Sequence, residues 1–251
     1  MKGSGATTSV WMETTEMGIT QTLTRDMTTD VCVVGAGISG LTTAYLLASE
    51  GQSVLVLDGG RIGSGETSRT TAHLSNALDD RYYKLRRLHG ERGAQLAAES
   101  HSKAIDTIEV IVTKENIACQ FERVDGYLFV PHGESKDVLD QELEAAHGAG
   151  LTSVERVPRA PLEGLDTGPC LRFPRQAQFH PLKYVEALAN EQEACLTPLL
   201  LAYRARGKAS SPLTTRDPWA YKVLADNANV VARRIALVKF RLQRKMPAWF
   251  H

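Results

Sequence analysis

The chain has 251 residues, 43% of them apolar and 23% charged, a composition typical of a globular protein with one large domain or two small ones. Its formal net charge is zero, so no overall excess of basic groups indicates binding to nucleic acid or to a membrane. No apolar run reaches membrane-spanning length. The four cysteines are widely spaced and form no zinc or iron–sulfur motif, so we expect no metal site. We also expect the thiols to be free and the protein to be cytoplasmic.

Residues 1–28 are rich in Thr, Ser and Gly, and they lack the basic start and apolar stretch of a signal peptide. This composition predicts a flexible N-terminal segment. The alternative is that the short apolar stretch of residues 10–12 docks on the rest of the protein.

Residues 29–58 have the order of a dinucleotide-binding βαβ unit. A β-branched apolar run at 31–34 predicts a buried strand, a helix-like segment follows, and a second apolar run at 54–57 ends in Asp58. Gly35, Gly37 and Gly40 lie between the first strand and the helix in the spacing G-x-G-x-x-G. An ordinary glycine turn would explain one of these glycines, but not three glycines together with the acid.

Each part of this unit has a physical role in nucleotide binding. Gly35 permits a sharp turn, Gly37 permits close approach of a pyrophosphate, and Gly40 permits tight packing of the helix on the strand. The N–H groups and the positive dipole end of the helix attract phosphate. Asp58 is expected to accept hydrogen bonds from the adenosine ribose, and its charge disfavours the 2′-phosphate of NADP.

Residues 59–74 form a loop rich in glycine and hydroxyl side chains. Such a loop offers N–H and O–H donors to a phosphate or to a polar ring edge, although it is also the composition of a simple surface loop. Its position after the acid places it at the carboxyl edge of the sheet, where ligands bind in open α/β folds.

The motifs GAGISGLTTAYLLASEG and VLVLDGGRIGSGETSRTTAHL resemble the start of FAD-dependent oxidoreductases of the D-amino-acid-oxidase-like (DAO) superfamily, which includes glycine oxidase and sarcosine oxidase. The TTAHL ending is similar to a bacterial branch that often carries a C-terminal Rieske domain. The resemblance implies a flavoprotein of α/β fold class: a Rossmann-like FAD-binding domain with part of an α+β substrate domain.

In that family the glycine turn holds the FAD pyrophosphate, the acid holds the ribose, and the following loop runs under the cofactor towards the flavin. Carried over by position, the expected cofactor-binding residues are Gly35, Ala36, Gly37, Ile38, Ser39, Gly40, Asp58, Arg61, Gly63, Gly65, Thr67, Thr70 and Thr71. The role of His73, in TTAHL, stays open between packing and flavin contact. The sequence nominates no catalytic residue.

Residues 81–115 predict a packing helix with an apolar stripe that includes His101 as a core histidine. Residues 117–130 predict a hairpin around Asp125-Gly126, and residues 133–150 predict an amphipathic helix with glycines at its ends and carboxylates on a solvated face. Residues 151–174 read as irregular chain or short strands, and a helix beginning at Pro181 matches the family's return to the FAD domain.

The charge changes sign near residue 190, because residues 1–190 carry 18 Lys/Arg against 25 Asp/Glu and residues 191–251 carry 11 against 4. After the return helix we expect none of the family's later strands, and we interpret the chain as C-terminally truncated, with a divergent tail produced by a frameshift or a fusion. A basic tail that binds nucleic acid or acidic lipid is the alternative. The expected parts are an N-terminal segment (1–28), a first half of the FAD domain with a helical insertion (29–115), a partial substrate domain (116–178), the return helix (179–190) and the basic tail (191–251).

The resemblance implies an oxidoreductase in which FAD accepts a hydride from the carbon bearing the nitrogen of a small amine or amino-acid substrate, leaving an imine. Neither a nucleic acid nor a membrane is an expected partner, and the oligomeric state is open. One alternative is a non-catalytic remnant that keeps only the ADP-binding half of the site. Another is an NAD-binding protein, since the glycine fingerprint alone does not separate FAD from NAD.

Overall fold

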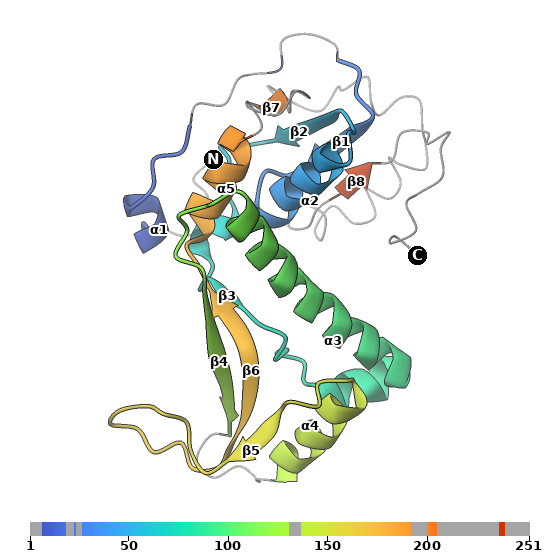
Figure 1. Cartoon of the computed structure of the whole chain (residues 1–251), viewed down its shortest axis with the longest axis vertical. Coiled ribbons are helices and arrows are strands. Elements are labelled where there is room, and N and C mark those ends of the chain that lie inside the picture. Colours follow the sequence, from blue (N-terminus) through green and yellow to red (C-terminus); the bar gives the residue numbers. More distant parts are fainter. Residues whose placement is uncertain are drawn as a thin grey trace. The chain divides into compact units, whose positions relative to one another are not determined.

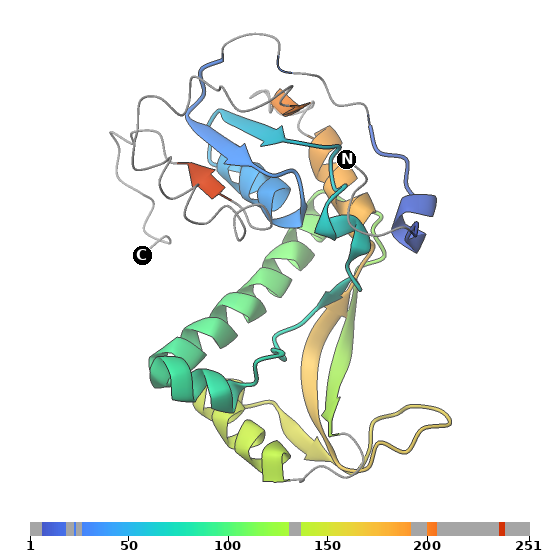
Figure 2. The same ribbon diagram turned by 180° about the vertical axis from the view of Figure 1, so that it is seen from behind.

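The structure is a computed structural model that describes residues 7–18, 23, 27–130, 137–191, 200–204 and 236–238, with side chains described up to residue 190. The chain divides into two compact units, which we describe separately. The first comprises residues 1–70 and 181–251, and the second comprises residues 71–180. Figures 1 and 2 show the helices and strands of both units from opposite sides.

The first unit is built on a sheet with the strand order β7-β2-β1-β8. Strands β1 (Val31–Val34) and β2 (Val54–Asp58) are parallel and pair in register, and helix α2 (Ile38–Ser49) connects them and packs on both. Figure 1 shows this strand, helix, strand order in blue. It confirms the Rossmann-like α/β fold class, because a crossover helix is what joins two adjacent parallel strands.

Helix α5 (Pro181–Glu191) begins at the proline where the return helix was predicted, and it packs against α2. The hydroxyls of Tyr184 on α5 and Thr42 on α2 lie 3.0 Å apart, and Tyr184 is fully buried. Strand β7 (Leu200–Arg204) follows α5 and pairs in parallel with β2. The sequence analysis expected none of the family's later strands after the return helix, and the structure places strand β7 there. The sequence signal of this strand is the apolar run of residues 199–203.

Strand β8 (Ala236–Val238) pairs antiparallel with β1 and is the other described part of the tail. The rest of the predicted basic tail (191–251) lies outside the described residues. Near the other terminus, helix α1 (Val10–Glu13) contacts α5 and the short 3-10 helix η1 (Glu66–Arg69). The docking alternative for residues 10–12 therefore holds, in place of a wholly flexible lead-in.

The second unit is an antiparallel sheet with the order β3-β6-β4, in which β5 also pairs with β6. Its strands are β3 (His73–Leu74), β4 (Glu122–Phe129), β5 (Glu155–Val157) and β6 (Cys170–Gln178). Strand β6 is the centre of this sheet, since each of the other three strands pairs with it.

The predicted hairpin at Asp125-Gly126 was wrong, because these two residues lie inside the continuous strand β4. Both halves of β4 pair with β6, and the register shifts at Asp125. There β6 contains Pro174 and the left-handed residue Arg175 (φ 58°), so the signal marks a β-bulge instead of a turn. The carboxylate of Asp125 accepts a hydrogen bond of 3.0 Å from the Arg172 guanidinium and one of 3.4 Å from the Arg175 backbone N–H.

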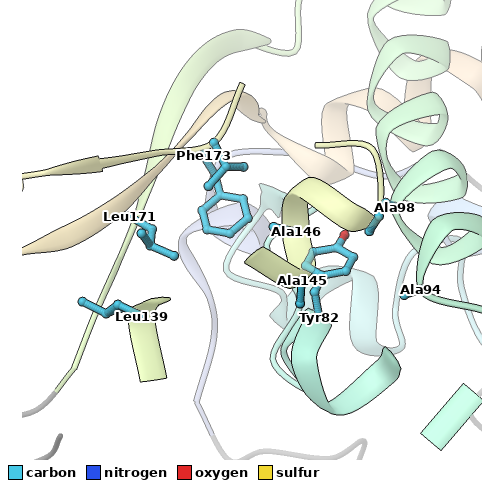
Figure 3. Packing of buried hydrophobic residues seen from close by; sticks show 10 residues of the cluster. Tyr82, Ala94, Ala98, Leu139, Ala145, Ala146, Leu171 and Phe173 are labelled. Atoms are coloured by element: carbon cyan, nitrogen blue, oxygen red, sulfur yellow. The ribbon is translucent and has the colours of Figure 1, made fainter. Parts of the chain in front are cut away.

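Helices α3 (Tyr82–Lys114) and α4 (Asp137–Gly148) pack together and form the core of the second unit with β6. Figure 3 shows that core, in which the buried side chains are Tyr82, Ala94, Ala98, Leu139, Ala145, Ala146, Ala149, Val154, Leu171 and Phe173. The predicted stripe on α3 is confirmed at Ala94, Ala98, Ile105, Ile108 and Ile111. His101 is exposed, so its assignment as a core histidine was wrong; its Nδ1 lies 2.9 Å from the carbonyl oxygen of Ala97, one turn earlier on the same helix.

The sequence predicted that the carboxylates of α4 lie on a solvated face, and this was wrong for Glu142. Glu142 is 1% exposed and accepts hydrogen bonds from the backbone N–H groups of Tyr82 (3.0 Å) and Tyr83 (3.2 Å). These groups begin α3 and have no acceptor within their own helix. Burial raises the pKa of Glu142, while the two N–H bonds act in the opposite direction. Glu142 is therefore a cap that one helix supplies to another.

The boundary between the units also differs from the expected one. The sequence interpretation kept residues 81–115 with the FAD domain, whereas α3 groups with residues 71–180. The reason is the packing of α3 on α4, which periodicity along α3 alone does not reveal.

Candidate cofactor site

The glycine turn lies between β1 and α2, and its three glycines are required for three different reasons. Gly35 has φ of 110°, a conformation that side chains rarely adopt. A Cβ on Gly37 would lie 2.8 Å from the Thr67 hydroxyl, and a Cβ on Gly40 would lie 1.8 Å from the carbonyl oxygen of Gly35. The turn is therefore closed tightly against itself and against the loop that contains Thr67.

The Asp58 side chain faces this turn from the carboxyl end of β2. Its Oδ2 accepts a hydrogen bond of 2.6 Å from the backbone N–H of Ala36, and its Oδ1 accepts one of 2.7 Å from Gly60. The carboxylate thereby joins the glycine turn to the start of the next loop. Since the carboxylate is only half-buried, it remains accessible from solvent.

The following loop folds back on the same turn. Gly63 donates a backbone hydrogen bond of 2.9 Å to the carbonyl of Ala36, and Thr67 Oγ1 accepts one of 3.2 Å from the N–H of Ile38. Gly63 also has a positive φ of 65°, and a Cβ there would lie 2.7 Å from Leu182 of α5. Gly63 is thus needed for packing of the loop against α5.

The other predicted residues occupy varied positions. Ile38, Ser39 and Gly40 form the first turn of α2, in which Ser39 is exposed and Gly40 is buried. Arg61 and Gly65 are exposed, and the carbonyl of Thr70 accepts a hydrogen bond of 2.9 Å from the indole N–H of Trp11. Thr71 belongs to the second unit, as does His73, which is exposed on β3.

The first turn of α2 is suited to an anion. Its N-cap, Gly37, supplies no side chain, and the N–H groups of Ser39 and Gly40 have no acceptor within the helix. The positive end of the helix dipole adds to their attraction for a phosphate. A Cβ built on Gly35 meets no atom within 4 Å, so there is open space beside the turn. The residues present therefore fit a nucleotide pyrophosphate next to a carboxylate.

Ser9 was missed by sequence reasoning, and Trp11 was named only within the docking alternative for residues 10–12; both bond to backbone carbonyls of the loop. Their signal was weak because both lie in a Thr- and Ser-rich stretch distant in sequence from the loop. Among the described residues, no group of three or more His, Cys, Asp or Glu side chains could hold a metal ion. No helix in that part of the chain combines the length and apolarity needed to cross a membrane.

Comparison with solved structures supports the fold. A P. horikoshii L-proline dehydrogenase aligns with 76% of this chain and 46% of its own at a TM-score of 0.55 and 16% identity. An L-amino acid deaminase from Proteus myxofaciens aligns with 78% of this chain and 43% of its own, with a TM-score of 0.57 and 14% identity. A Bacillus cereus glycine oxidase covers 70% of this chain and 48% of its own, with a TM-score of 0.53 and 16% identity.

Sequence relatives agree with these structures. The Bacillus subtilis protein YhfW, whose name assigns it a Rieske 2Fe-2S iron–sulfur centre, is 32% identical over 181 residues, which are 72% of this chain and 35% of YhfW. The γ-glutamylputrescine oxidoreductase of Escherichia coli is 28% identical over 182 residues, which are 72% of this chain and 39% of the enzyme. The chain thus spans between a third and two fifths of the length of these relatives. Residues 30–194 match the family described as FAD dependent oxidoreductase, and the chain therefore belongs to this DAO family of flavoproteins.

Proposed function

We propose that the first unit binds the ADP half of FAD and that this chain acts in the oxidation of a small amine or amino acid. The observation that carries the proposal is the position of the Asp58 carboxylate. It lies against the glycine turn, within hydrogen-bond distance of Ala36 and Gly60, at the carboxyl end of β2. A ribose beside a pyrophosphate on the first turn of α2 would meet this carboxylate.

Each part of the site has its own proposed task. The N–H groups of Ser39 and Gly40 would bind the pyrophosphate, and Asp58 would accept hydrogen bonds from the ribose hydroxyls. The loop that contains Arg61, Gly65 and Thr67 would line the path of the cofactor away from the turn. When bound, FAD would supply the hydride acceptor, and the protein would bind and orient it.

The substrate class comes from the relatives alone. A γ-glutamylputrescine oxidoreductase is among the sequence relatives, and a glycine oxidase and an L-amino acid deaminase are among the structural ones. These names favour a carbon–nitrogen bond as the bond oxidised. We also propose a cytoplasmic location, since Cys32 and Cys170 are free thiols.

Flavin titration of the full chain tests the proposal. FAD is added to apoprotein and binding is followed by flavin fluorescence and by visible absorbance, with NAD in a parallel titration. We expect FAD to bind and NAD to bind far more weakly. Asp58→Ala should weaken FAD binding about 10- to 100-fold, because each lost hydrogen bond to a charged group is worth about 1.5–3 kcal/mol.

Asp30→Asn is the matched control. Asp30 is an exposed carboxylate next to β1 that also bonds to a backbone N–H, that of Ser53, but it lies at the amino end of the strand. Its substitution should leave the FAD affinity unchanged. If excess FAD shows no change in flavin fluorescence or visible absorbance on addition to the chain, the proposal is refuted and the non-catalytic remnant is favoured. If FAD binds, the holoprotein is mixed anaerobically with a panel of amines and amino acids. Bleaching of the bound flavin identifies the substrate class.

A further inference from the structure

The short helix α1 is fastened to the proposed cofactor loop by two side chains. The Ser9 hydroxyl accepts a hydrogen bond of 3.3 Å from the N–H of Met12, which caps α1, and donates one of 2.6 Å to the carbonyl of Ser68. The indole N–H of Trp11 donates a bond of 2.9 Å to the carbonyl of Thr70. Both bonds join residues 59 positions apart in the sequence.

These two carbonyls belong to the segment that reaches the glycine turn. Ser68 lies in η1 and Thr70 is its C-cap. Thr67, in the same short helix, accepts the hydrogen bond from the N–H of Ile38, the first residue of α2. The short helix η1 therefore connects the contacts of α1 to the first turn of α2, where the pyrophosphate is proposed to bind.

The loop between β2 and η1 needs such support. It contains Gly59, Gly60, Gly63 and Gly65, and glycine lowers the free-energy cost of leaving the folded backbone conformation. A binding loop that is ordered before the ligand arrives has less conformational entropy to lose on binding. Contacts at the far end of η1 therefore favour cofactor binding without touching the cofactor.

We propose that Trp11 and Ser9 are positioning residues for the cofactor loop, acting through the carbonyls of Thr70 and Ser68 on Thr67 and the start of α2. This inference rests on the proposed binding of FAD. It assigns to the segment before the βαβ unit a role in cofactor affinity.

The test compares FAD dissociation constants of full-length variants, measured well below their unfolding temperatures. Trp11→Phe keeps an aromatic ring and removes the N–H, and Ser9→Ala removes the hydroxyl. We expect each to weaken FAD binding about twofold to tenfold, the range for loss of one neutral hydrogen bond. Ser9→Thr keeps a hydroxyl and should restore binding. Val10→Ser, on the same helix at a side chain that is 60% exposed, is the control and should leave the affinity unchanged.

Hydrogen exchange of the apoprotein separates failure of this inference from failure of FAD binding. In Trp11→Phe, amides of residues 66–71 and of the first turn of α2 should exchange faster, and those of β4 and β6 should not. If the wild type binds no FAD, the proposed function is wrong, and the exchange data still decide whether α1 orders the loop. If it binds FAD and Trp11→Phe changes neither affinity nor exchange, or if Val10→Ser has an equal effect, the positioning role is refuted.

Discussion

Replacement of Glu142 by alanine should destabilise the second unit by removing the cap of α3. The variant leaves the N–H of Tyr82 without its acceptor in a buried position, and that of Tyr83 in a partly buried one. An orphaned buried donor costs about 1–3 kcal/mol, and the buried carboxylate that is lost carried a desolvation cost of its own. The net loss should be about 2–4 kcal/mol in the free energy of unfolding.

Glu142→Gln separates the cap from the charge. The amide oxygen can still accept one of the two N–H groups, so the loss should be smaller, about 1–2 kcal/mol. The pH dependence should also change. Burial raises the pKa of Glu142 in the folded protein, so a pH-linked part of the stability, separate from the hydrogen bonds of the cap, is fully present below the unfolded-state pKa of about 4.3. That contribution is lost as the pH rises through the raised value, and the glutamine variant should lack this loss.

Urea unfolding followed by circular dichroism, repeated at several pH values, measures both effects. Glu144→Ala on the same helix is the control, since the Glu144 side chain is 73% exposed and its ion pair with Arg86 should be worth no more than about 1 kcal/mol. If Glu142→Ala unfolds within about 0.5 kcal/mol of Glu144→Ala, the reasoning about the shared cap is refuted.

Two further predictions concern packing and charge. Gly40→Ala should lower the free energy of unfolding by about 3 kcal/mol or more and abolish FAD binding, because its Cβ would lie 1.8 Å from the Gly35 carbonyl oxygen. Thermal unfolding measures the loss. Gly59→Ala is the control, since a Cβ there meets no atom within 4 Å. A double-mutant cycle of Arg123 and Glu109, whose charged atoms lie 2.5 Å apart with side chains 17% and 36% exposed, should give a coupling of about 0.5–1.5 kcal/mol that shrinks in 1 M salt. A coupling that ignores salt would contradict the ion-pair interpretation.

The βαβ unit could be read from the sequence because its signals are local. Strand, glycine turn, helix and acid follow one another within 30 residues, and each needs only its own neighbours to be recognised. Gly35 is required by its positive φ and Gly40 by its contact with the Gly35 carbonyl, both within this stretch. The start of α5 at Pro181 was predictable for the same reason, since a proline at the first helical position is a local signal.

The features that were mispredicted depend on partners distant in the sequence. Asp125-Gly126 has the composition of a turn, but the pairing offered by β6, about 50 residues later, made it a bulge. Glu142 has the pattern of a solvated residue, but the N-terminus of α3, 60 residues earlier, buried it. Composition predicted a flexible segment over residues 1–28, with docking of residues 10–12 as the alternative, whereas Trp11 and Ser9 bond to two carbonyls 59 residues away.

The sequence by itself therefore determined the family, through its motifs. It also determined the fold class and the residues around the glycine turn, because short-range sterics and hydrogen bonding impose the βαβ unit. Only the tertiary structure decided which strand pairs with β4, which carboxylate caps α3 and what supports the loop after Asp58. Such contacts form because folding brings unpaired donors and acceptors together across long stretches of chain, where each buried one must find a partner.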